Sequence, residues 1–386
     1  MNERKNKLNE IVKKCLKWLE RIQFKTNDFH SGGFSPYPET VKSAGSLATA
    51  DVLTFLQRSN IEEPDIINDS IEFLLRAQIN ENKEYPSQIG GFPPIGDFEL
   101  ILDTAFSDST ADAVLGLLSS LRKIEDKKYK KEITKSIEEG IKWLLNCYKA
   151  TNSLPLPTYF IKEEYNIGPK RYFPTILTGL AFITYKDYCK QINKAVKQEI
   201  EEYISNLKAI ILSKLKEHGS IPFGDYEEPS IMNTILGIEF LLLSNKNSRT
   251  DEETKESLKK GYIWLMGRFN ELLMKGKKDY IFTDFDPVHI DIPEVSEGDY
   301  PATYFTLPSM ARLLVEDPFP SDLNENEKLL TSLISELLDI VEIKIVENVE
   351  VAYYWEYRGR KEPATSATAS AIYTLNIVLE KGGVKL

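Results

Sequence analysis

Hydrophobic residues in this chain recur in two alternating helical patterns. The first is amphipathic with a period of 3.6 residues, so that one face is apolar and the other charged, as in Leu8 to Ile22 and Ile200 to Ile211. Four copies share the order small, apolar, any, aromatic, Leu, and two weaker copies keep the rhythm; they lie at residues 15–19, 70–75, 140–145 and 261–265, and at 203–215 and 329–341. The pattern predicts six helices with one side in water.

A second kind of helix is predicted after each of these, beyond a loop rich in Gly, Pro and aromatic residues. It begins with small or hydroxylated residues and becomes apolar on nearly all sides, which indicates burial all round. The six segments are Ser46 to Leu56, Asp108 to Leu121, Pro174 to Ile183, Pro229 to Leu243, Pro301 to Leu314 and Pro363 to Leu379. Four begin with Pro, which is favoured in a first helical turn.

Together the two patterns predict six helical hairpins at a mean spacing of about 64 residues (386/6). An open array of repeats needs polar end caps, but the terminal repeats here resemble the middle ones. We therefore expect an all-α fold, an α/α toroid or (α/α)6 barrel, with six inner helices inside six outer ones. A single domain would span 1–386, with repeats at 1–60, 61–125, 126–190, 191–248, 249–320 and 321–386. A two-domain helical bundle and an open superhelix are the alternatives.

Composition narrows the functions that such a ring could have. Lys and Arg number 48 and Asp and Glu 59, a net charge of −11, which argues against nucleic-acid binding by general electrostatic attraction. The N-terminus is charged and apolar runs stay short, so we expect no signal peptide, no membrane span and a cytoplasmic location. The three Cys lack paired spacing, which makes a disulfide framework unexpected.

Two hairpins carry a more specific motif, aromatic-Leu-x3-Gln followed by Gly-x-aromatic. It reads Trp18-Leu19-x3-Gln23 then Gly32-Gly33-Phe34, and Phe73-Leu74-x3-Gln78 then Gly90-Gly91-Phe92. Repeats three and five keep aromatic-Leu but have Tyr148 and Phe269 in place of Gln. The motif resembles the repeat of squalene and terpenoid cyclases and of protein prenyltransferase β subunits, which are α/α toroids.

That resemblance implies one catalytic candidate. Class II terpenoid cyclases protonate an alkene with the middle Asp of Asp-x-Asp-Asp-Thr-Ala, and Phe106-Ser107-Asp108-Ser109-Thr110-Ala111 is the nearest match, which places Asp108 at the acid position. Both flanking carboxylates are replaced. Asp103 and Asp112 are further carboxyl candidates beside it, and the alternative is that Asp108 caps the helix. We expect no metal site, and Mg only if a diphosphate is bound.

The starts of the inner helices should share one rim, where helix dipoles favour anions. Basic residues precede two of these starts and form a candidate anion-binding rim: Lys170, Arg171, Arg358, Arg360 and Lys361. An acidic stretch from Asp284 to Asp299 could form a lid, a cation site or a partner surface, with Asp284, Asp286, His289 and Asp291 as its candidates. The alternative for both groups is a set of solvated loop charges.

Aromatic residues are concentrated in the same loops and are candidates for lining a central cavity. The set is Phe106, Tyr172, Phe173, Tyr226, Tyr300, Tyr304, Tyr354 and Trp355. Packing between hairpins is the alternative role.

Three functions remain open at this point. The first is a non-catalytic toroid that binds an apolar or anionic small molecule, or a partner protein or peptide, at its cavity or rim. The second is a terpenoid-cyclase-like enzyme that uses Asp108. The third is a carbohydrate-active α/α-barrel enzyme with paired carboxylates such as Asp103 and Asp108, or Asp225 and Glu227, which would have to face each other across the mouth.

Overall fold

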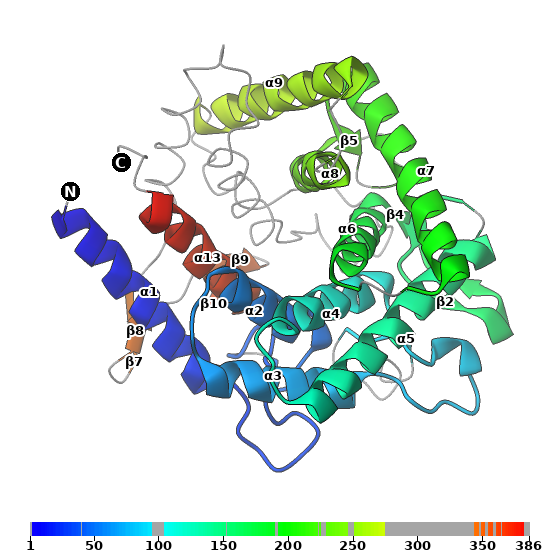
Figure 1. Ribbon diagram of the computed structural model, residues 1–386. Coiled ribbons are helices and arrows are strands. Elements are labelled where there is room, and N and C mark those ends of the chain that lie inside the picture. The colour runs from blue at the N-terminus through cyan, green and yellow to red at the C-terminus, as the bar shows by residue number, and fades with distance from the viewer. Residues whose placement is uncertain are drawn as a thin grey trace.

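The computed structural model has the toroidal architecture that the repeat pattern predicts (Figure 1). It describes residues 2–39, 41–94, 104–151, 153–189, 192–222, 224, 229–245, 251–274, 343–346, 349–351, 354–357, 360–363 and 365–381. The predicted helices at 301–314 and 329–341 lie outside these residues, and the single domain over 1–386 stays a prediction.

The described helices form two concentric layers, with amphipathic helices outside and apolar ones inside (Figure 1). The outer helices are α1 (Asn2–Ile22), α3 (Pro64–Ala77), α5 (Lys127–Thr151), α7 (Lys194–His218) and α9 (Glu252–Met274). The inner helices are α2 (Ser46–Arg58), α4 (Ser107–Ser120), α6 (Tyr172–Tyr188), α8 (Ile231–Ser244) and α13 (Thr365–Lys381). Consecutive inner helices pack against each other, from α2 through α4 and α6 to α8. The hydrophobic core lies between the two layers.

The last inner helix returns to the first repeat. Helix α13 packs against both α1 and α2. Thr365 Oγ1 donates a hydrogen bond to the carbonyl oxygen of Ser35 at 2.6 Å, and Asn376 Nδ2 donates to that of Ser59 at 2.9 Å. The rings of Phe55 and Tyr373 stack with centroids 5.8 Å apart. These contacts join the two ends of the chain and exclude an open superhelix.

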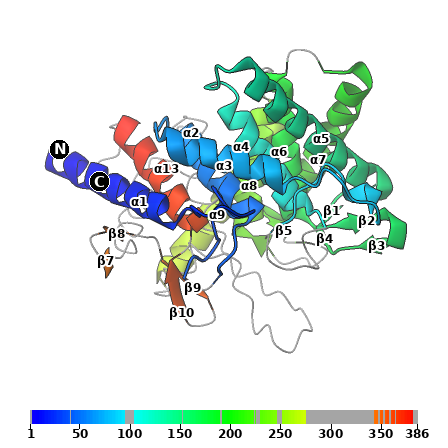
Figure 2. The same ribbon diagram turned by 90° about the horizontal axis from the view of Figure 1, so that it is seen from below.

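The loops depart from the predicted all-α character by forming short antiparallel pairs of strands. They are β1 (Leu156–Pro157) with β4 (Lys170–Arg171), β2 (Phe160–Ile161) with β3 (Asn166–Ile167), β5 (Ile221–Pro222) with β6 (Pro229–Ser230), β7 (Ile343–Val346) with β8 (Val349–Val351), and β9 (Tyr354–Tyr357) with β10 (Arg360–Pro363). Two 3₁₀ turns, η1 (Pro86–Gln88) and η2 (Lys162–Glu164), complete the loops. The strands gather on one side of the helical layers (Figure 2). Proline fits such extended segments better than it fits a helix interior.

In α2, α4, α6 and α8, the threonine at the fourth helical position fixes the loop that precedes the helix. The backbone N–H of Phe34 donates to Thr49 Oγ1 at 2.9 Å, and that of Phe92 donates to Thr110 Oγ1 at 2.9 Å. The same bond joins Leu156 to Thr175 at 2.7 Å and Ile221 to Thr234 at 2.9 Å. Each hydroxyl thus satisfies a buried backbone donor, which sets the position of the loop against the helix start.

The Gln and Gly residues shared by repeats one and two have a packing explanation. The buried Gln78 Nε2 donates to the carbonyl oxygens of Gly90 and of Ser136 on α5, both at 2.9 Å. Gln23 Nε2 likewise donates to Gly32 at 2.9 Å and to Ile66 on α3 at 3.2 Å. Each Gln therefore ties one outer helix to its own loop and to the next outer helix.

The two bonded glycines are required by their backbone conformation. Gly32 and Gly90 have φ values of +80° and +94°, which side-chain-bearing residues rarely adopt. A Cβ atom would also collide with the backbone of Asp69 at Gly32 and with that of Glu139 at Gly90. The motif thus positions hairpins by close backbone approach.

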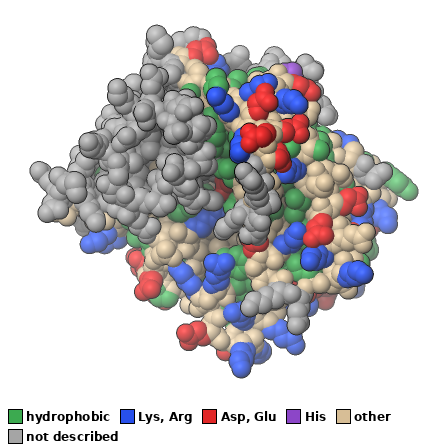
Figure 3. Space-filling model, turned by 45° about the horizontal axis from the view of Figure 1, so that its top comes forward, with side chains coloured by type: hydrophobic (Ala, Val, Ile, Leu, Met, Phe, Trp, Pro, Cys, Tyr) green, Lys and Arg blue, Asp and Glu red, His purple; other side chains and the backbone are tan. Residues whose placement is uncertain are grey.

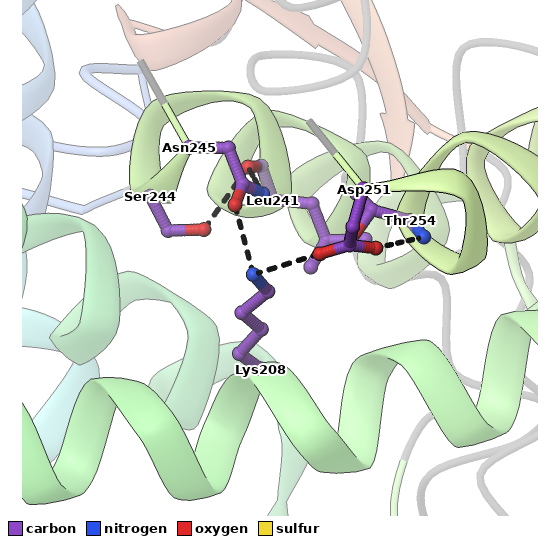
Figure 4. A network of polar contacts seen from close by, with 6 residues as sticks. All are labelled: Lys208, Leu241, Ser244, Asn245, Asp251 and Thr254. Carbon is purple, nitrogen blue, oxygen red and sulfur yellow. Dashed lines mark hydrogen bonds and ion pairs between the residues drawn. The ribbon is translucent and has the colours of Figure 1, made fainter. Parts of the chain in front are cut away.

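Polar side chains hold the solvent-facing turns. Lys208 Nζ on α7 donates to Asn245 Oδ1 at 2.8 Å and forms an ion pair with Asp251 Oδ2 at 3.8 Å, so it joins the end of α8 to the start of α9 (Figure 4). Acidic and basic side chains are interspersed over the face shown in Figure 3. Across the described part of the chain, every helix is too short or too polar to cross a membrane.

Replacing Gln78 with Ala should destabilise the fold, because the buried carbonyl oxygen of Gly90 would lose its hydrogen-bond donor. We expect the free energy of unfolding to fall by about 1 to 3 kcal/mol, the usual effect of leaving a buried polar group unsatisfied. Urea unfolding followed by circular dichroism measures the change. Gln198→Ala, at an exposed position of α7, is the matched control and should change little. Equal effects of the two substitutions would contradict the proposed role of Gln78.

Candidate functional site

Each inner helix turns one face away from the outer layer and towards the centre of the ring. Counted from the first residue of each inner helix, positions 4, 8 and 11 face outwards. A side chain at Gly140 of α5 would collide with Val114 of α4, and one at Gly261 of α9 would press on Ile238 of α8. Val114 and Ile238 both occupy position 8. At about 100° per residue, positions 2, 6, 9 and 13 lie on the opposite side.

Burial confirms the direction of this inward face. At positions 8 and 11 every side chain is fully buried, whereas positions 2 and 13 include half-buried residues such as Leu47, Phe173 and Thr184. The inward residues are Leu47, Asp51, Thr54 and Arg58 on α2; Asp108, Asp112, Leu115 and Ser119 on α4; Phe173, Leu177, Leu180 and Thr184 on α6; Met232, Leu236, Glu239 and Leu243 on α8; and Ser366, Ser370 and Tyr373 on α13.

Two carboxyl groups occupy the same inward position on neighbouring helices. Asp51 of α2 and Asp112 of α4 are both at position 6, and they are 2% and 3% exposed. The Oδ2 atom of each is buried and has no hydrogen-bond partner among the described residues. Buried polar atoms are normally paired, so this acidic pair is an energetically unfavourable feature that a packed core alone does not require.

The environment of the pair favours its protonated forms. Burial raises the pKa of Asp51 from its ordinary value of 3.8 to about 7, against a smaller opposing effect of a hydrogen bond from Ser366. Burial also raises the pKa of Asp112 well above that value, and the charges of Asp51 and Asp108 raise it further, while Arg58 opposes them. Because the charge of Asp51 raises the pKa of Asp112, the two groups do not easily ionise together, which favours retention of a proton by the pair near neutral pH.

Asp108 lies nearer the mouth, one helical turn from Asp112. Burial raises the pKa of Asp108, while hydrogen bonds from Ser109 and the charge of Arg171 oppose the shift. Its Oδ1 accepts from the Ser109 N–H at 2.7 Å. Helix α4 begins at Ser107 and its N-cap residue is Phe106, so the prediction that Asp108 caps the helix is wrong by two positions.

The structure brings part of the predicted basic rim to the mouth. Lys170 and Arg171 form β4, immediately before α6, and both are half-buried. Lys170 Nζ donates to Ser153 Oγ at 2.6 Å, and Arg171 is close enough to influence Asp108. Arg360 and Lys361 lie in β10, immediately before α13. Their predicted role in anion binding stays a prediction, and Arg358 lies outside the described residues.

The predicted cavity aromatics divide into three groups. Phe173 is half-buried on the inward face, as a lining residue should be. Tyr172 is buried, and Phe106 packs on Tyr159 with ring centroids 5.4 Å apart, which is packing between loops. Tyr354 and Trp355 lie in β9. The remaining candidates lie outside the described residues: Tyr226, Tyr300, Tyr304, Asp103, Asp225, Glu227 and the acidic candidates Asp284, Asp286, His289 and Asp291.

Sequence reasoning missed three charged residues of the inward face, namely Asp51, Arg58 and Glu239. Glu239 is at position 9 of α8, which lies across the ring from α2 (Figure 1). One signal could have revealed Asp51: the tripeptide Thr-Ala-Asp occurs both at Thr49 to Asp51 and at Thr110 to Asp112. Within the described parts of the chain, no group of three or more His, Cys, Asp or Glu side chains is arranged to hold a metal ion.

No protein-family model matches this sequence, and no curated protein matches it. Solved structures do match. Cellobiose 2-epimerase from Bacillus thermoamylovorans superposes with a TM-score of 0.63 at 13% identity, over 98% of this chain and 100% of that one. A D-mannose isomerase gives 0.61 at 12% identity, over 96% and 97%. An α-1,6-mannanase of family GH76 from Salegentibacter sp. gives 0.58 at 13% identity, over 96% and 98%. These similarities show a shared (α/α)6 barrel fold.

They also correct the resemblance drawn from the sequence motif. Similar solved structures include sugar epimerases, an isomerase and mannanases, which contradicts the resemblance to terpenoid cyclases and prenyltransferase β subunits. The motif misled because its Gln and Gly residues bond helices and loops together within a hairpin ring, as Gln23 and Gln78 do here. Its presence therefore reports on toroidal packing and carries no information about chemistry. The isoprenoid role of Asp108 depended on the same resemblance and is withdrawn with it.

Asp51→Asn should stabilise the protein at alkaline pH. Because folding raises the pKa of Asp51, its contribution to stability is fully present below about pH 4 and is lost as the pH rises through about 7. Asn keeps the shape without the buried charge. We expect a gain at pH 8 on the order of 2 to 4 kcal/mol, from about 1.4 kcal/mol per pKa unit, and little change near pH 4.

Thermal unfolding at pH 4, 6 and 8 measures the effect of Asp51→Asn. The control is Asp65→Asn, which removes a carboxylate at an exposed position of α3. A stability difference between Asp51→Asn and wild type that does not change with pH would show that the buried carboxyl titrates normally.

Proposed function

We propose that this protein is a carbohydrate-active enzyme that transfers protons to and from a sugar at the centre of the toroid, with Asp51 and Asp112 as its acid–base pair. One observation carries the proposal: two buried, partly unpaired carboxyl groups face the centre from neighbouring inner helices, and both have raised pKa values. Perturbed acids at an inward position are typical of catalytic sites. The similarity to barrels described as sugar epimerases and a mannose isomerase supports the choice of substrate.

The reaction class follows from the protonation of the pair. Isomerisation or epimerisation of a reducing sugar begins when a base removes the proton next to the carbonyl carbon. The electron pair moves onto the carbonyl oxygen, which takes a proton from an acid and gives an enediol. Returning a proton to either carbon yields the isomeric ketose or the epimer. A carboxyl pair that holds one proton near pH 7 supplies both the base and the acid.

Hydrolysis of a glycosidic bond is the second candidate, and Glu239 favours it. Glu239 is on the inward side of α8, and α8 lies across the ring from α2, the helix that carries Asp51. Glycosidases place two carboxyl groups on opposite sides of the scissile bond. The mannanase similarity points the same way, but variants of that mannanase described as inactive lack two aspartates adjacent in its sequence. This chain contains no Asp-Asp pair, so proton transfer on a reducing sugar is favoured.

Deuterium exchange distinguishes the two reactions. We expect the purified protein, incubated in D₂O with glucose, mannose or cellobiose, to incorporate deuterium at C2 and to form the epimer or ketose, as followed by NMR. Asp112→Asn should lower the rate by about 10²- to 10⁴-fold, the usual contribution of a general acid or base. Asp187→Asn, at an exposed position of α6, should retain the wild-type rate.

Circular dichroism would verify that Asp112→Asn is folded. Release of reducing ends from oligosaccharides, without deuterium at C2, would favour the hydrolase. Wild-type turnover by Asp112→Asn in either assay would refute the assignment of the acid–base pair.

A further inference from the structure

The described part of the inward face is divided into two unlike halves. Three consecutive inner helices, α13, α2 and α4, carry polar groups at position 6, which are Ser370, Asp51 and Asp112. The next two, α6 and α8, carry Leu177 and Leu236 at that position. A sugar ring has hydroxyl groups around its edge and C–H groups on its faces. The two halves can therefore bind the two kinds of surface, with hydroxyls towards the acids and a C–H face towards the leucines.

Among the described residues of this face, acidic side chains outnumber basic ones. Its described residues include four carboxyl groups, Asp51, Asp108, Asp112 and Glu239, and one cation, Arg58. The groups interact: Asp51 and Asp108 raise the pKa of Asp112, and Arg58 lowers it. Interactions between charges are strong in such a buried environment, because little water screens them. The Oδ2 atoms of Asp51 and Asp112 are buried and have no hydrogen-bond partner among the described residues, so each retains the capacity to accept a hydrogen bond from a ligand that enters the centre.

From these features we infer that the site selects uncharged sugars and rejects sugar acids and sugar phosphates. The inference rests on the proposed function and adds its substrate class. A sugar hydroxyl can donate a hydrogen bond to the Oδ2 atoms of Asp51 and Asp112. A carboxylate or phosphate on the sugar would instead be repelled by those acidic groups of this face that are ionised. Asp108 is placed to exert this repulsion first, since it lies one turn nearer the mouth than Asp112. The charge of Arg171 lowers the pKa of Asp108 against the effect of burial, and so favours the ionised form of Asp108 that repels an anion.

Matched ligands test the inference. Glucose and glucuronate differ in replacing CH₂OH by a carboxylate, and glucose 6-phosphate adds a larger anion. Isothermal titration at pH 8 should give an affinity for glucuronate weaker than that for glucose by at least about tenfold, with glucose 6-phosphate weaker still. At pH 5.5 the difference in affinity between glucose and glucuronate should be smaller, because the carboxyl groups of the site take up protons while glucuronate stays ionised.

Two variants should shift this discrimination in opposite directions. Asp108→Asn removes a negative charge near the start of α4 and should reduce the difference in affinity between glucose and glucuronate. Arg58→Met removes a cation of the inward face and should widen the difference in affinity between glucose and glucuronate. A merely structural disturbance would weaken the binding of both ligands in both variants. Opposite changes in the affinity difference would therefore identify charge as the cause. Circular dichroism verifies that both variants fold.

The outcomes separate this inference from the proposed function. If the protein binds glucose but binds glucuronate equally or more tightly, the site does not select uncharged sugars. That result would leave the proposed carbohydrate-active enzyme unaffected. Binding of neither ligand, with no other sugar bound or converted in the panel above, would overturn both. Binding of glucose alone, with the two opposite shifts, is the result we expect.

Discussion

The packing of α13 against α2 closes the ring, and the candidate site exists only because of that closure. An open array of the same hairpins would expose one side of each apolar inner helix to water. In the ring, that side faces other inner helices across the centre, and residues at positions 2, 6, 9 and 13 come together from segments far apart in the sequence. The bonds from Thr365 and Asn376 to the first repeat are therefore as important to the site as the residues that line it.

Closure also explains why the acidic pair is unusual. A carboxyl group at the centre of a ring of apolar helices loses its hydration, which disfavours the charged form. Asp51 and Asp112 stand where α6 and α8 carry Leu177 and Leu236, so the fold accepts an apolar residue at this position. Removing charge would therefore relieve the fold of an unfavourable group. Retaining destabilising groups at a converging site is the usual compromise between stability and activity.

The repeat pattern predicted the architecture well because packing imposes it on every hairpin. Amphipathic segments had to be outer helices, and all-apolar segments such as Pro229 to Leu243 had to be inner ones. The site was harder to predict, since an inward aspartate and a capping aspartate look alike in sequence. A family motif points to Asp108, whereas the larger pKa shifts are those of Asp112 and its neighbour Asp51. Their proximity depends on contact between α2 and α4, which no local pattern encodes.

The threonine bridges have a consequence for how such a ring can diversify. The same hydroxyl-to-backbone bond spans separations of 15, 18, 19 and 13 residues in four repeats. Each intervening loop can therefore lengthen, or fold into a pair of strands, while the helix that follows starts at an unchanged place. In each of these four repeats, the threonine holds the start of the inner helix in place, while the loop before it is free to differ in length. Grafting a loop between two such anchor points would alter what enters the barrel without rebuilding its walls.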